Sequence, residues 1–477
     1  MSVRGHHIDG VWTGSGSGSE REIVNPSDES VIGVAVSGTA EDVDRAVSAA
    51  RAAAEGWADA VPAERAGILL RFADAIESHA DQLAQIELLN VGKPRAAADG
   101  EPAAAVDMLR FYAGASRVLT APASGEYVAG VTAMLRRDPL GVVACIAPWN
   151  YPLSTAVAKI APALAAGNTV VLKPSELTPL SALQMMELAS EIFPPGVINL
   201  VTGDGDPVGE ALARHPGIDM ISMTGSTRTG RRIAGVASET LKRVHLELGG
   251  NAPVVVFEDA DVDALVQTLR MASFWNSGQE CGAASRLIVH RSLLGEVVEE
   301  MTSMMATIVV GDPRDEGTEI GPLISHAQRD RVRGLVRTAA ENGAEIATGG
   351  SDAGKQKGFF FEPTLVVDIR DDDPLVQEET FGPVVTVQAF DAEEEALRLA
   401  NSSPYALSGS VWTKDLSRAL RFTRRMRAGT AWVNTHLAFS SELPWGGPGA
   451  TGGGRDGSAL ALEDHTRARN VLVAYEG

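Results

Sequence analysis

The sequence predicts an α/β protein that contains parallel sheets in two or three domains. Short apolar segments alternate with amphipathic helical segments between residues 141 and 248, and this alternation is typical of strand–helix–strand units in a parallel sheet. A second stretch of the same kind runs from about residue 253 to residue 434. With 477 residues, the chain is also too long for a single hydrophobic core.

Long helices are expected in the first part of the chain. Alanine, glutamate and arginine recur at helical spacing over residues 40–60 and 63–91, which predicts two amphipathic helices. The second helix is expected to end at Gly92, because Lys93 and Pro94 follow it. A third helix is predicted over residues 107–119.

Strands are expected after these helices. Residues 134–141 are interpreted as a turn between two strands, the second of which runs through apolar residues into Pro148. The glycine-rich residues 446–457 are expected to form a loop. Further strands are predicted over residues 168–174, 197–201, 220–223, 253–257, 384–387, 431–434 and 470–473, with a helix over residues 178–192.

The composition favours a soluble globular protein and argues against several kinds of partner. Hydrophobic residues make up 44% and charged residues 22% of the chain. The net charge of −21 disfavours nucleic acid and anionic membrane surfaces as partners. The longest apolar region, 141–172, is interrupted by prolines and polar residues, so no membrane span is expected. With no recognisable signal peptide, we expect a cytoplasmic protein.

The cysteines and histidines indicate neither disulfides nor a metal site. Only two cysteines are present, which favours a reducing compartment. Cys145 lies in an apolar run and is interpreted as a buried small side chain in a strand. The nine histidines form no cluster with ligand spacing, so no metal is predicted.

Cys281 is the strongest candidate for a catalytic residue. It lies in the segment 278–286, GQECGAASR, where small neighbours leave room for a ligand and Gly278 permits a sharp turn. A thiol attacks a carbonyl only as a thiolate, so another group must lower its pKa or accept its proton. The alternative, which is the usual fate of a lone cysteine, is a buried structural residue.

Glu247 is the candidate general base. Strand alternation places Leu246 and Leu248 on one face and His245 with Glu247 on the other, and two glycines then end the strand. A carboxyl group whose pKa is raised in a dry site acts as a base near neutral pH. On spacing alone, a carboxylate in solvent or in an ion pair is the better interpretation, and the joint occurrence with Cys281 favours the base.

Asn150 is the candidate oxyanion donor. It lies in the segment 148–152, PWNYP, where two prolines rigidify a turn at a strand end. A side-chain amide can donate to the oxyanion of a tetrahedral adduct, but an asparagine that merely forms the turn is at least as good an interpretation.

Three segments could hold a nucleotide. An acidic residue such as Glu176, just past a strand end, can accept both ribose hydroxyls and would repel a 2′-phosphate. Ser175 could also cap a helix with Glu176 in its first turn, and both interpretations can hold together. The glycine-rich segment 203–209 is a weak signal. Residues 223–230 follow a strand and begin a helix whose N-terminus can bind a pyrophosphate, although it could equally be an ordinary capped helix.

In this order and spacing, the motifs resemble those of the NAD(P)-dependent aldehyde dehydrogenases, and the resemblance covers essentially the whole chain. It includes the segments EETFGPV at 378–384, GPLI at 321–324 and LEDHT at 462–466. The resemblance implies that Cys281 is the nucleophile, Glu247 the general base and Asn150 the oxyanion donor. The aldehyde would be oxidised through a thiohemiacetal and a thioester on the cysteine, and Glu247 would activate the water that releases the acid.

The motifs and the resemblance predict NAD as the cofactor, and Glu176 makes NADP less favourable. The predicted cofactor contacts are Trp149, Lys173, Ser175, Glu176, Gly205, Gly209, Thr224, Gly225, Ser226, Leu248, Glu379 and Phe381.

Within the family, the chain looks most like the γ-aminobutyraldehyde and betaine-aldehyde dehydrogenases, on the segments 110–115, 125–127, 136–143, 432–437 and 441–444. This likeness implies an ω-aminoaldehyde such as 4-aminobutyraldehyde as substrate, with betaine aldehyde or a broad range of aliphatic and aromatic aldehydes as the alternative. Glu280 could pair with a cationic tail, or could form a salt bridge elsewhere. Candidate aromatic contacts to the cation are Tyr151, Trp275 and Phe439.

The resemblance also implies three domains and a homo-oligomer. Residues 1–121 and 141–248 would form an NAD-binding domain and residues 249–448 a catalytic domain, each with a parallel sheet. Residues 122–140 and 449–477 would form a small β arm that joins subunits into a dimer or tetramer. Gly449 and Thr451 stand where the family commonly has Lys and Ser, so the role of this glycine-rich loop stays open.

Two other classes of protein remain in view. An acylating, coenzyme-A-dependent relative would retain the cysteine but would not be expected to retain a base at Glu247. A non-catalytic nucleotide-binding protein would have no reason to combine Cys281, Glu247 and Asn150.

Overall fold

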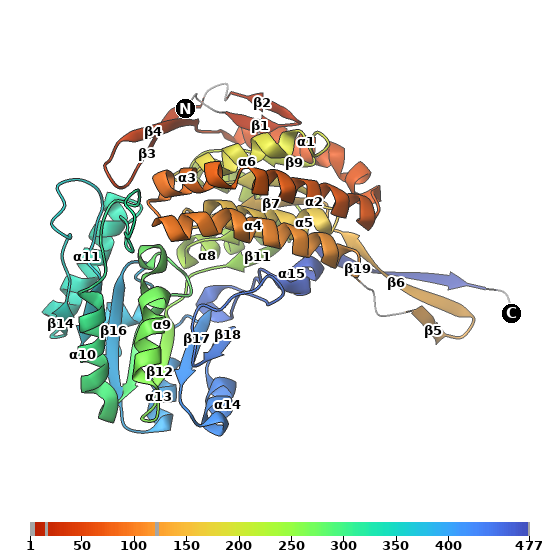
Figure 1. The fold of residues 1–477 in the computed structure, drawn as a ribbon. Coiled ribbons are helices and arrows are strands. Elements are labelled where there is room, and N and C mark those ends of the chain that lie inside the picture. Colours follow the sequence, from red (N-terminus) through yellow and green to blue (C-terminus); the bar gives the residue numbers. More distant parts are fainter. Residues whose placement is uncertain (1–4, 15–17, 120–123, 476–477) are drawn as a thin grey trace.

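The computed structural model describes residues 5–14, 18–119 and 124–475 (Figure 1). They form two seven-stranded sheets, a separate three-stranded sheet and a two-stranded ribbon. The predicted α/β class with two sheet domains and a small β arm is therefore confirmed. The predicted boundary between residues 121 and 122 lies outside the described residues.

The first sheet is built mainly from parallel strands, in the order β11-β10-β7-β8-β9-β1-β2. Every residue of β7 and β8 is buried, because helices cover both faces, and this explains why these strands are continuous apolar runs. Only β1 and β2 at one edge are antiparallel. The strands are β1 (His6–Ile8), β2 (Val11–Thr13), β7 (Val142–Ile146), β8 (Thr169–Lys173), β9 (Ile198–Leu200), β10 (Met220–Thr224) and β11 (Arg243–Glu247).

The helices around this sheet share a core of small and aliphatic side chains. The expected single helix over residues 63–91 is wrong, because the chain breaks at His79, whose φ and ψ are −114° and 19°. The stop at Gly92 is confirmed: this residue has a left-handed φ of 81°. The helices are α1 (Ala40–Asp59), α2 (Pro62–Ser78), α3 (Ala80–Val91), α4 (Arg95–Ser116), α5 (Pro152–Ala165), α6 (Leu180–Ser190), α7 (Glu210–Arg214) and α8 (Thr227–Ala237); the ribbon is β3 (Glu20–Val24) with β4 (Val31–Val36).

The second sheet has the order β14-β15-β16-β13-β12-β17-β18, and only β14 is antiparallel to its neighbour. Its strands are β12 (Ala252–Val256), β13 (Ala284–His290), β14 (Glu345–Thr348), β15 (Thr364–Val367), β16 (Val384–Phe390), β17 (Ser408–Trp412) and β18 (Thr430–Val433). Its helices are α9 (Val262–Phe274), α10 (Leu294–Met305), α11 (His326–Glu341), α12 (Pro374–Gln377), α13 (Glu393–Ala400) and α14 (Leu416–Arg425).

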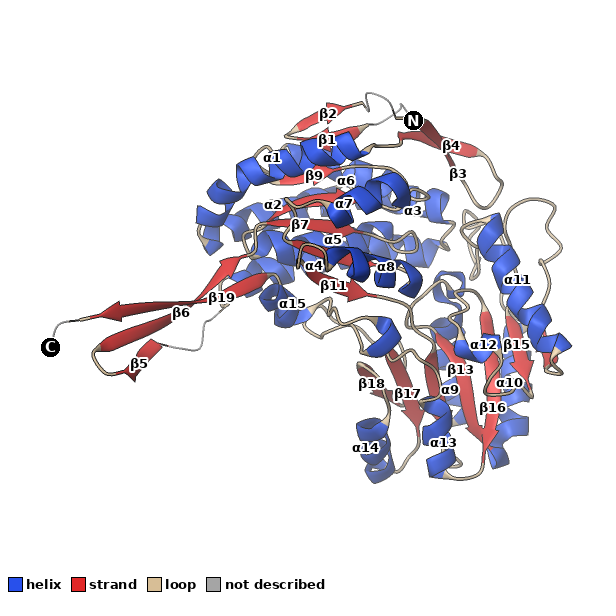
Figure 2. Cartoon of the chain, turned by 180° about the vertical axis from the view of Figure 1, so that it is seen from behind, coloured by secondary structure: helices blue, strands red, loops and turns tan. Residues whose placement is uncertain are grey.

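The three-stranded sheet projects away from both larger sheets (Figures 1 and 2). It consists of β5 (Ser124–Val128), β6 (Val131–Pro139) and β19 (Thr466–Ala474). The expected turn over residues 134–141 is wrong, because β6 continues to Pro139. The reason is a partner remote in sequence: β19 pairs with β6 along its whole length.

The C-terminal segment divides between the arm and the body of the protein. Residues 449–477 were expected to form the arm and tail together with residues 122–140, and within the described part of this segment β19 joins the three-stranded sheet. The preceding helix, α15 (Ser458–Asp464), contacts α4 and α5 of the body as well as β19. None of the helices in the described ranges is both long and apolar enough to cross a membrane.

Candidate active site

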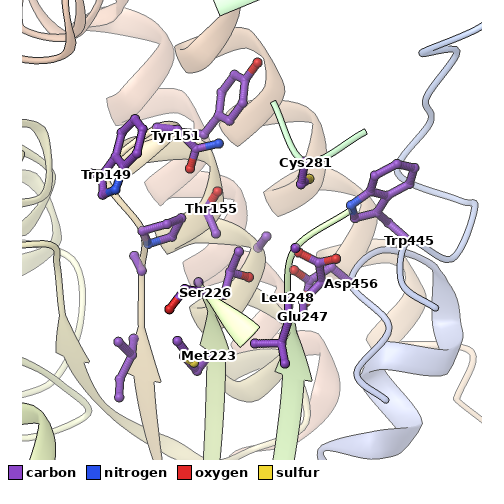
Figure 3. Close-up of a pocket in the computed structure, with 18 of the residues that line it drawn as sticks. Trp149, Tyr151, Thr155, Met223, Ser226, Glu247, Leu248, Cys281, Trp445 and Asp456 are labelled. Atoms are coloured by element: carbon purple, nitrogen blue, oxygen red, sulfur yellow. The ribbon is translucent and has the colours of Figure 1, made fainter. Parts of the chain in front are cut away.

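A cavity of about 1630 Å³ lies between the two large sheets. One wall comes from the carboxyl ends of β7, β8, β10 and β11, which is where open parallel sheets bind their ligands. The other wall comes from the segments that precede β12, β13 and β16. Figure 3 shows side chains from both walls, including Cys281 and Ser226, turned toward this space.

Cys281 lies on the cavity wall in the tight turn that leads into β13. The turn follows three residues with positive φ, namely Asn276, Ser277 and Gly278. A Cβ at Gly250 would stand 2.1 Å from the Cys281 carbonyl oxygen, so only glycine allows the two loops to approach this closely. The backbone that carries Cys281 is therefore packed directly against Gly250.

The surroundings of Cys281 favour the protonated thiol. Its Sγ donates to Glu280 Oε1 at 3.3 Å, and the Gly282 backbone N–H donates to the same oxygen at 3.1 Å. Burial raises the pKa of the thiol well above its usual value, and the charges of Glu280 and Glu247 raise it further. Ionisation of this thiol therefore needs a base or a compensating positive charge.

Glu247 ends β11 and is 1% exposed. Burial raises its pKa well above the usual value, the charge of Asp456 raises it further, and Lys159 opposes this shift. Its Oε1 has no hydrogen-bond partner among the described residues. The alternative of a carboxylate in solvent or in an ion pair is thus wrong. His245, Leu246 and Glu247 are all buried, so both faces of the strand are covered at this end.

Asn150 lies in the turn before α5, and its side chain reaches the nucleophile loop. Its Nδ2 donates to the Gln279 carbonyl at 3.0 Å, while Asn276 Nδ2 donates to the Asn150 carbonyl at 3.1 Å. These bonds hold the Asn150 amide against the loop of Cys281, because Gln279 is two residues before Cys281 in the chain. Since an amide nitrogen has two protons, it can donate to a second acceptor.

An ion pair beside Glu247, between Lys159 and Asp456, was not predicted from the sequence. Lys159 Nζ, within α5, lies 2.7 Å from Asp456 Oδ1, and His245 Nε2 lies 3.1 Å from the same oxygen. Asp456 lines the cavity, and Figure 3 shows it beside Glu247. Although burial opposes it, Lys159 and His245 hold the pKa of Asp456 below its usual value. The available signals were a lysine inside an apolar helix and an aspartate in a glycine-rich loop.

Lys173 and Glu176 form an ion pair on the nucleotide side of the cavity. Lys173 Nζ lies 3.5 Å from Glu176 Oε2, and burial lowers the pKa of the lysine. The interpretation of Ser175 as a helix cap is wrong, because α6 begins only at Leu180. Ser175 Oγ instead accepts from the Leu177 backbone N–H at 3.3 Å in a turn. Glu176 therefore lines the cavity from a loop.

The N-terminus of α8 opens onto the same side of the cavity. Ser226 caps this helix of 11 residues by accepting from the Thr229 backbone N–H, so the remaining free N–H groups can bind an anion. Four predicted contacts line the wall nearby: Gly205, Gly209, Thr224 and Gly225.

Aromatic and acidic side chains complete the nucleotide side of the cavity. The Trp149 and Phe381 rings meet edge to face with centroids 5.1 Å apart. Glu379 Oε1 accepts from the Gly250 backbone N–H at 2.9 Å, and burial raises the pKa of Glu379 to about 7. Leu248 also lines the wall. An anion site at a helix terminus and a carboxylate for hydroxyl groups are the groups that a dinucleotide requires, so these residues fit one.

Three of the four predicted substrate contacts, Tyr151, Glu280 and Phe439, line the cavity. Trp275 does not, because it follows α9 and is half-buried away from the wall. Trp445 lines the cavity in its place and packs edge to face on Phe439, with centroids 4.7 Å apart. No signal in the sequence could distinguish Trp275 from Trp445 as the cavity residue.

Comparison with known proteins identifies the family of the chain. The family model for the aldehyde dehydrogenase family matches residues 12–471. The chain belongs to the aldehyde dehydrogenase family. The resemblance expected from the sequence motifs is confirmed, and the protein is an oxidoreductase that acts on aldehydes.

The aldehyde dehydrogenases that the chain resembles differ in their named substrates. It is 41% identical to a phenylacetaldehyde dehydrogenase of Pseudomonas fluorescens, over 98% of this chain and 95% of the relative. It is 39% identical to a betaine aldehyde dehydrogenase of Bacillus subtilis, over 97% and 96% of the two chains. It is 38% identical to a chloroplastic aminoaldehyde dehydrogenase of Arabidopsis thaliana, over 99% and 96%.

Two solved structures share the whole architecture. The structure of betaine aldehyde dehydrogenase from Staphylococcus aureus in complex with NAD⁺ has a TM-score of 0.96, 36% identity and coverage of 98% of this chain and 94% of that one. The structure of PnpE from Pseudomonas sp. WBC-3 has a TM-score of 0.97 and 41% identity, and it covers 100% and 98% of the two chains.

Proposed function

We propose that this aldehyde dehydrogenase oxidises a cationic ω-aminoaldehyde, such as 4-aminobutyraldehyde, to its carboxylic acid with NAD as hydride acceptor. The observation that carries the proposal is the meeting of Cys281, Glu247 and Asn150 at one cavity whose substrate-facing charges are acidic. A bound cofactor of this kind, as in the Staphylococcus aureus relative, would be held by Lys173, Glu176 and the N-terminus of α8.

Acylation uses the nucleophile and the amide donor. Cys281 Sγ, as a thiolate, forms a bond to the aldehyde carbon, and the carbonyl oxygen becomes an oxyanion. The Asn150 amide and the Cys281 backbone N–H donate to this oxygen. A nicotinamide ring, when bound, accepts the hydride that leaves the same carbon. Cys281 then holds the acyl group as a thioester.

Deacylation uses Glu247. Its carboxylate takes a proton from water, the hydroxide attacks the thioester carbon, and the Cys281 thiolate leaves. The raised pKa of Glu247 makes it a stronger base than an exposed carboxylate. Asp456 and Lys159, which lie next to it, provide a polar route by which its proton can leave.

A cationic substrate fits the charge of the cavity wall. The wall formed by α4 and residues 438–445 includes Asp107, and Glu280 lies beside the thiol. Among the described residues that line this part of the wall, no lysine or arginine is present. The Tyr151 ring contributes less than expected to cation binding, because Lys93 Nζ already lies 3.7 Å from its centroid. Glu280 and Asp107 therefore supply the attraction.

Replacing Glu280 by glutamine is expected to raise KM for 4-aminobutyraldehyde at least about tenfold, the scale of one partly desolvated charge contact. Steady-state kinetics would compare this substrate with pentanal, an uncharged aldehyde of similar length, whose KM should change little. If both substrates respond alike, or if neutral aldehydes are the better substrates of the unaltered enzyme, the aminoaldehyde assignment fails.

We also expect kcat/KM with NAD to exceed that with NADP by roughly tenfold or more, because Glu176 would face the 2′-phosphate as a like charge. In Glu176→Gln this difference should narrow. Equal efficiency with both cofactors in the unaltered enzyme would mean that Lys173, 3.5 Å from Glu176, compensates for the carboxylate.

A broad aliphatic or aromatic aldehyde dehydrogenase is the second candidate, and the phenylacetaldehyde dehydrogenase relative favours it. A kinetic panel of aminoaldehydes, betaine aldehyde, phenylacetaldehyde and aliphatic aldehydes separates the two. The reaction product distinguishes a hydrolytic enzyme, which releases the free acid, from an acylating enzyme, which forms acyl-coenzyme A. NADH formation by the purified protein separates all of these from a non-catalytic nucleotide-binding protein.

We further propose a homo-oligomer, dimer or tetramer, that is joined through the three-stranded arm. Tyr127 on β5 is 73% exposed and Leu472 on β19 is 63% exposed, and exposed apolar side chains on a projecting sheet favour contact with another subunit. Both cysteines are free, which agrees with a reducing, cytoplasmic location. The domain division proposed from the sequence places the cavity between the NAD-binding and catalytic domains.

A further inference from the structure

We propose that Glu280 couples recognition of the substrate's positive charge to ionisation of the nucleophile. Its carboxylate holds Cys281 as a thiol before substrate binds, and a cation paired with Glu280 releases the thiol proton. Glu280 is then a specificity-determining residue that acts on the reactivity of the thiol as well as on substrate binding. This inference rests on the proposed cationic substrate.

In the contact between Cys281 and Glu280, the thiol is the donor and the carboxylate is the acceptor. Glu280 Oε1 accepts both from the Cys281 thiol, at 3.3 Å, and from the Gly282 backbone N–H, at 3.1 Å. The backbone bond anchors the carboxylate to the loop that carries the thiol, so it stays beside Sγ. A thiol can donate to this oxygen, whereas a thiolate would face it as a like charge. The contact therefore stabilises the protonated form.

The charges that act most strongly on Sγ besides Glu280 also favour the protonated thiol. Besides Glu280, the charged groups with the largest effect on it are the carboxyls of Glu247 and Glu379, and both disfavour the thiolate when ionised. Glu379 is tied to the Gly250 backbone N–H, and Glu247 is buried. Tyr151, which lies next to Glu280, is kept neutral because burial and the Glu280 charge raise its pKa. Glu280 is the carboxylate in direct contact with the thiol.

A cation can reach Glu280 from the cavity. The side chain lines the wall and is only partly buried. A substrate ammonium group paired with it offsets the negative charge that Sγ experiences, and the thiol proton then passes to water while the electron pair stays on sulfur. A neutral aldehyde leaves the Glu280 charge uncompensated, so it meets a thiol rather than a thiolate. Discrimination then arises before the chemical step.

The resting effect can be tested by the rate at which iodoacetamide, a neutral reagent, alkylates the full-length enzyme. Glu280→Gln is expected to raise the rate at Cys281 at least about tenfold near neutral pH, since one pKa unit changes the thiolate fraction by that factor. Glu378→Gln removes the same charge from the cavity wall at a carboxylate that pairs with Arg331 rather than with the thiol, and its alkylation rate should stay within about twofold. Cys145 is fully buried, so peptide mass spectrometry should find the label on Cys281. An unchanged or lower rate in Glu280→Gln overturns the proposal.

The coupling is tested by adding 4-amino-1-butanol or its uncharged counterpart 1-pentanol, which occlude the cavity to a similar extent. In the unaltered enzyme, alkylation with the amine present should be at least about tenfold faster than with pentanol, and in Glu280→Gln the ratio should be close to one. A ratio near one in the unaltered enzyme overturns the coupling. If the amine does accelerate alkylation but neutral aldehydes are the better substrates, the substrate proposal fails and the coupling stands.

Discussion

Replacing Cys281 by alanine is expected to abolish aldehyde oxidation, by a factor on the order of a thousand or more, while NAD binding remains nearly intact. The sulfur forms the only covalent bond to substrate in the proposed mechanism. Its side chain lies in the loop before β13, whereas the groups proposed to bind the ribose and pyrophosphate lie beyond β8 and β10. NADH formation measures the first effect, and quenching of protein fluorescence on titration with NAD measures the second.

Cys145→Ala is the matched control, because it removes the other thiol of the chain. Cys145 is buried in β7 and donates weakly to the Lys159 carbonyl at 3.5 Å, so its loss should cost modest stability and little activity. Turnover in Cys281→Ala comparable to that of the unaltered enzyme would remove the central claim. Loss of NAD binding in the same variant would mean that the loop, and not only the thiol, had been disturbed.

Replacing Glu247 by glutamine is expected to allow a burst of about one NADH per active site, followed by a stall. Acylation needs the thiolate and the amide donor, whereas hydrolysis of the thioester needs a base. Glutamine has nearly the same shape and keeps the buried site filled, but it cannot accept a proton. Stopped-flow absorbance resolves the burst from the steady state, and mass spectrometry of the stalled enzyme should find the acyl group on Cys281.

The pH dependence provides an independent check on Glu247. The base works when deprotonated, and burial followed by the charge of Asp456 raises the pKa of Glu247 above that of an ordinary carboxylate. Deacylation should therefore fall as the pH drops through this raised pKa, and the residual activity of Glu247→Gln should lack that acid limb. Absence of the burst in the variant would instead place Glu247 at the earlier step, as acceptor of the thiol proton.

The parallel sheets could be predicted from sequence because their strands are buried on both faces. Such strands appear as continuous apolar runs separated by helical segments, and β7, β8 and β12 are all of this type. The arm was harder to predict, because β6 is stabilised by β19, more than 300 residues away in the chain. The interruption of the long helix at His79 left no proline or glycine to mark it.

The catalytic candidates were recognisable because their neighbours are unusual. Glycine and alanine beside Cys281, and two glycines after Glu247, occur where loops must approach closely. At Gly250 the reason is steric, because a Cβ there would collide with the Cys281 carbonyl oxygen. Lys159 and Asp456 were not recognisable in this way. The lysine lies on an apolar helix and the aspartate in a glycine-rich loop, and they form an ion pair only because α5 and residues 446–457 pack together in the fold.

By itself, the sequence determined the family and the two sheets, and it supplied the candidates for the nucleophile, the base and the amide donor. These features depend on local pattern and on short motifs, each of which is a few consecutive residues. Only the tertiary structure decided where side chains point: Glu280 toward the thiol, Trp275 away from the cavity and Trp445 into it. Electrostatic environment follows from those positions, since desolvation and the distance between charges act through space and not along the chain.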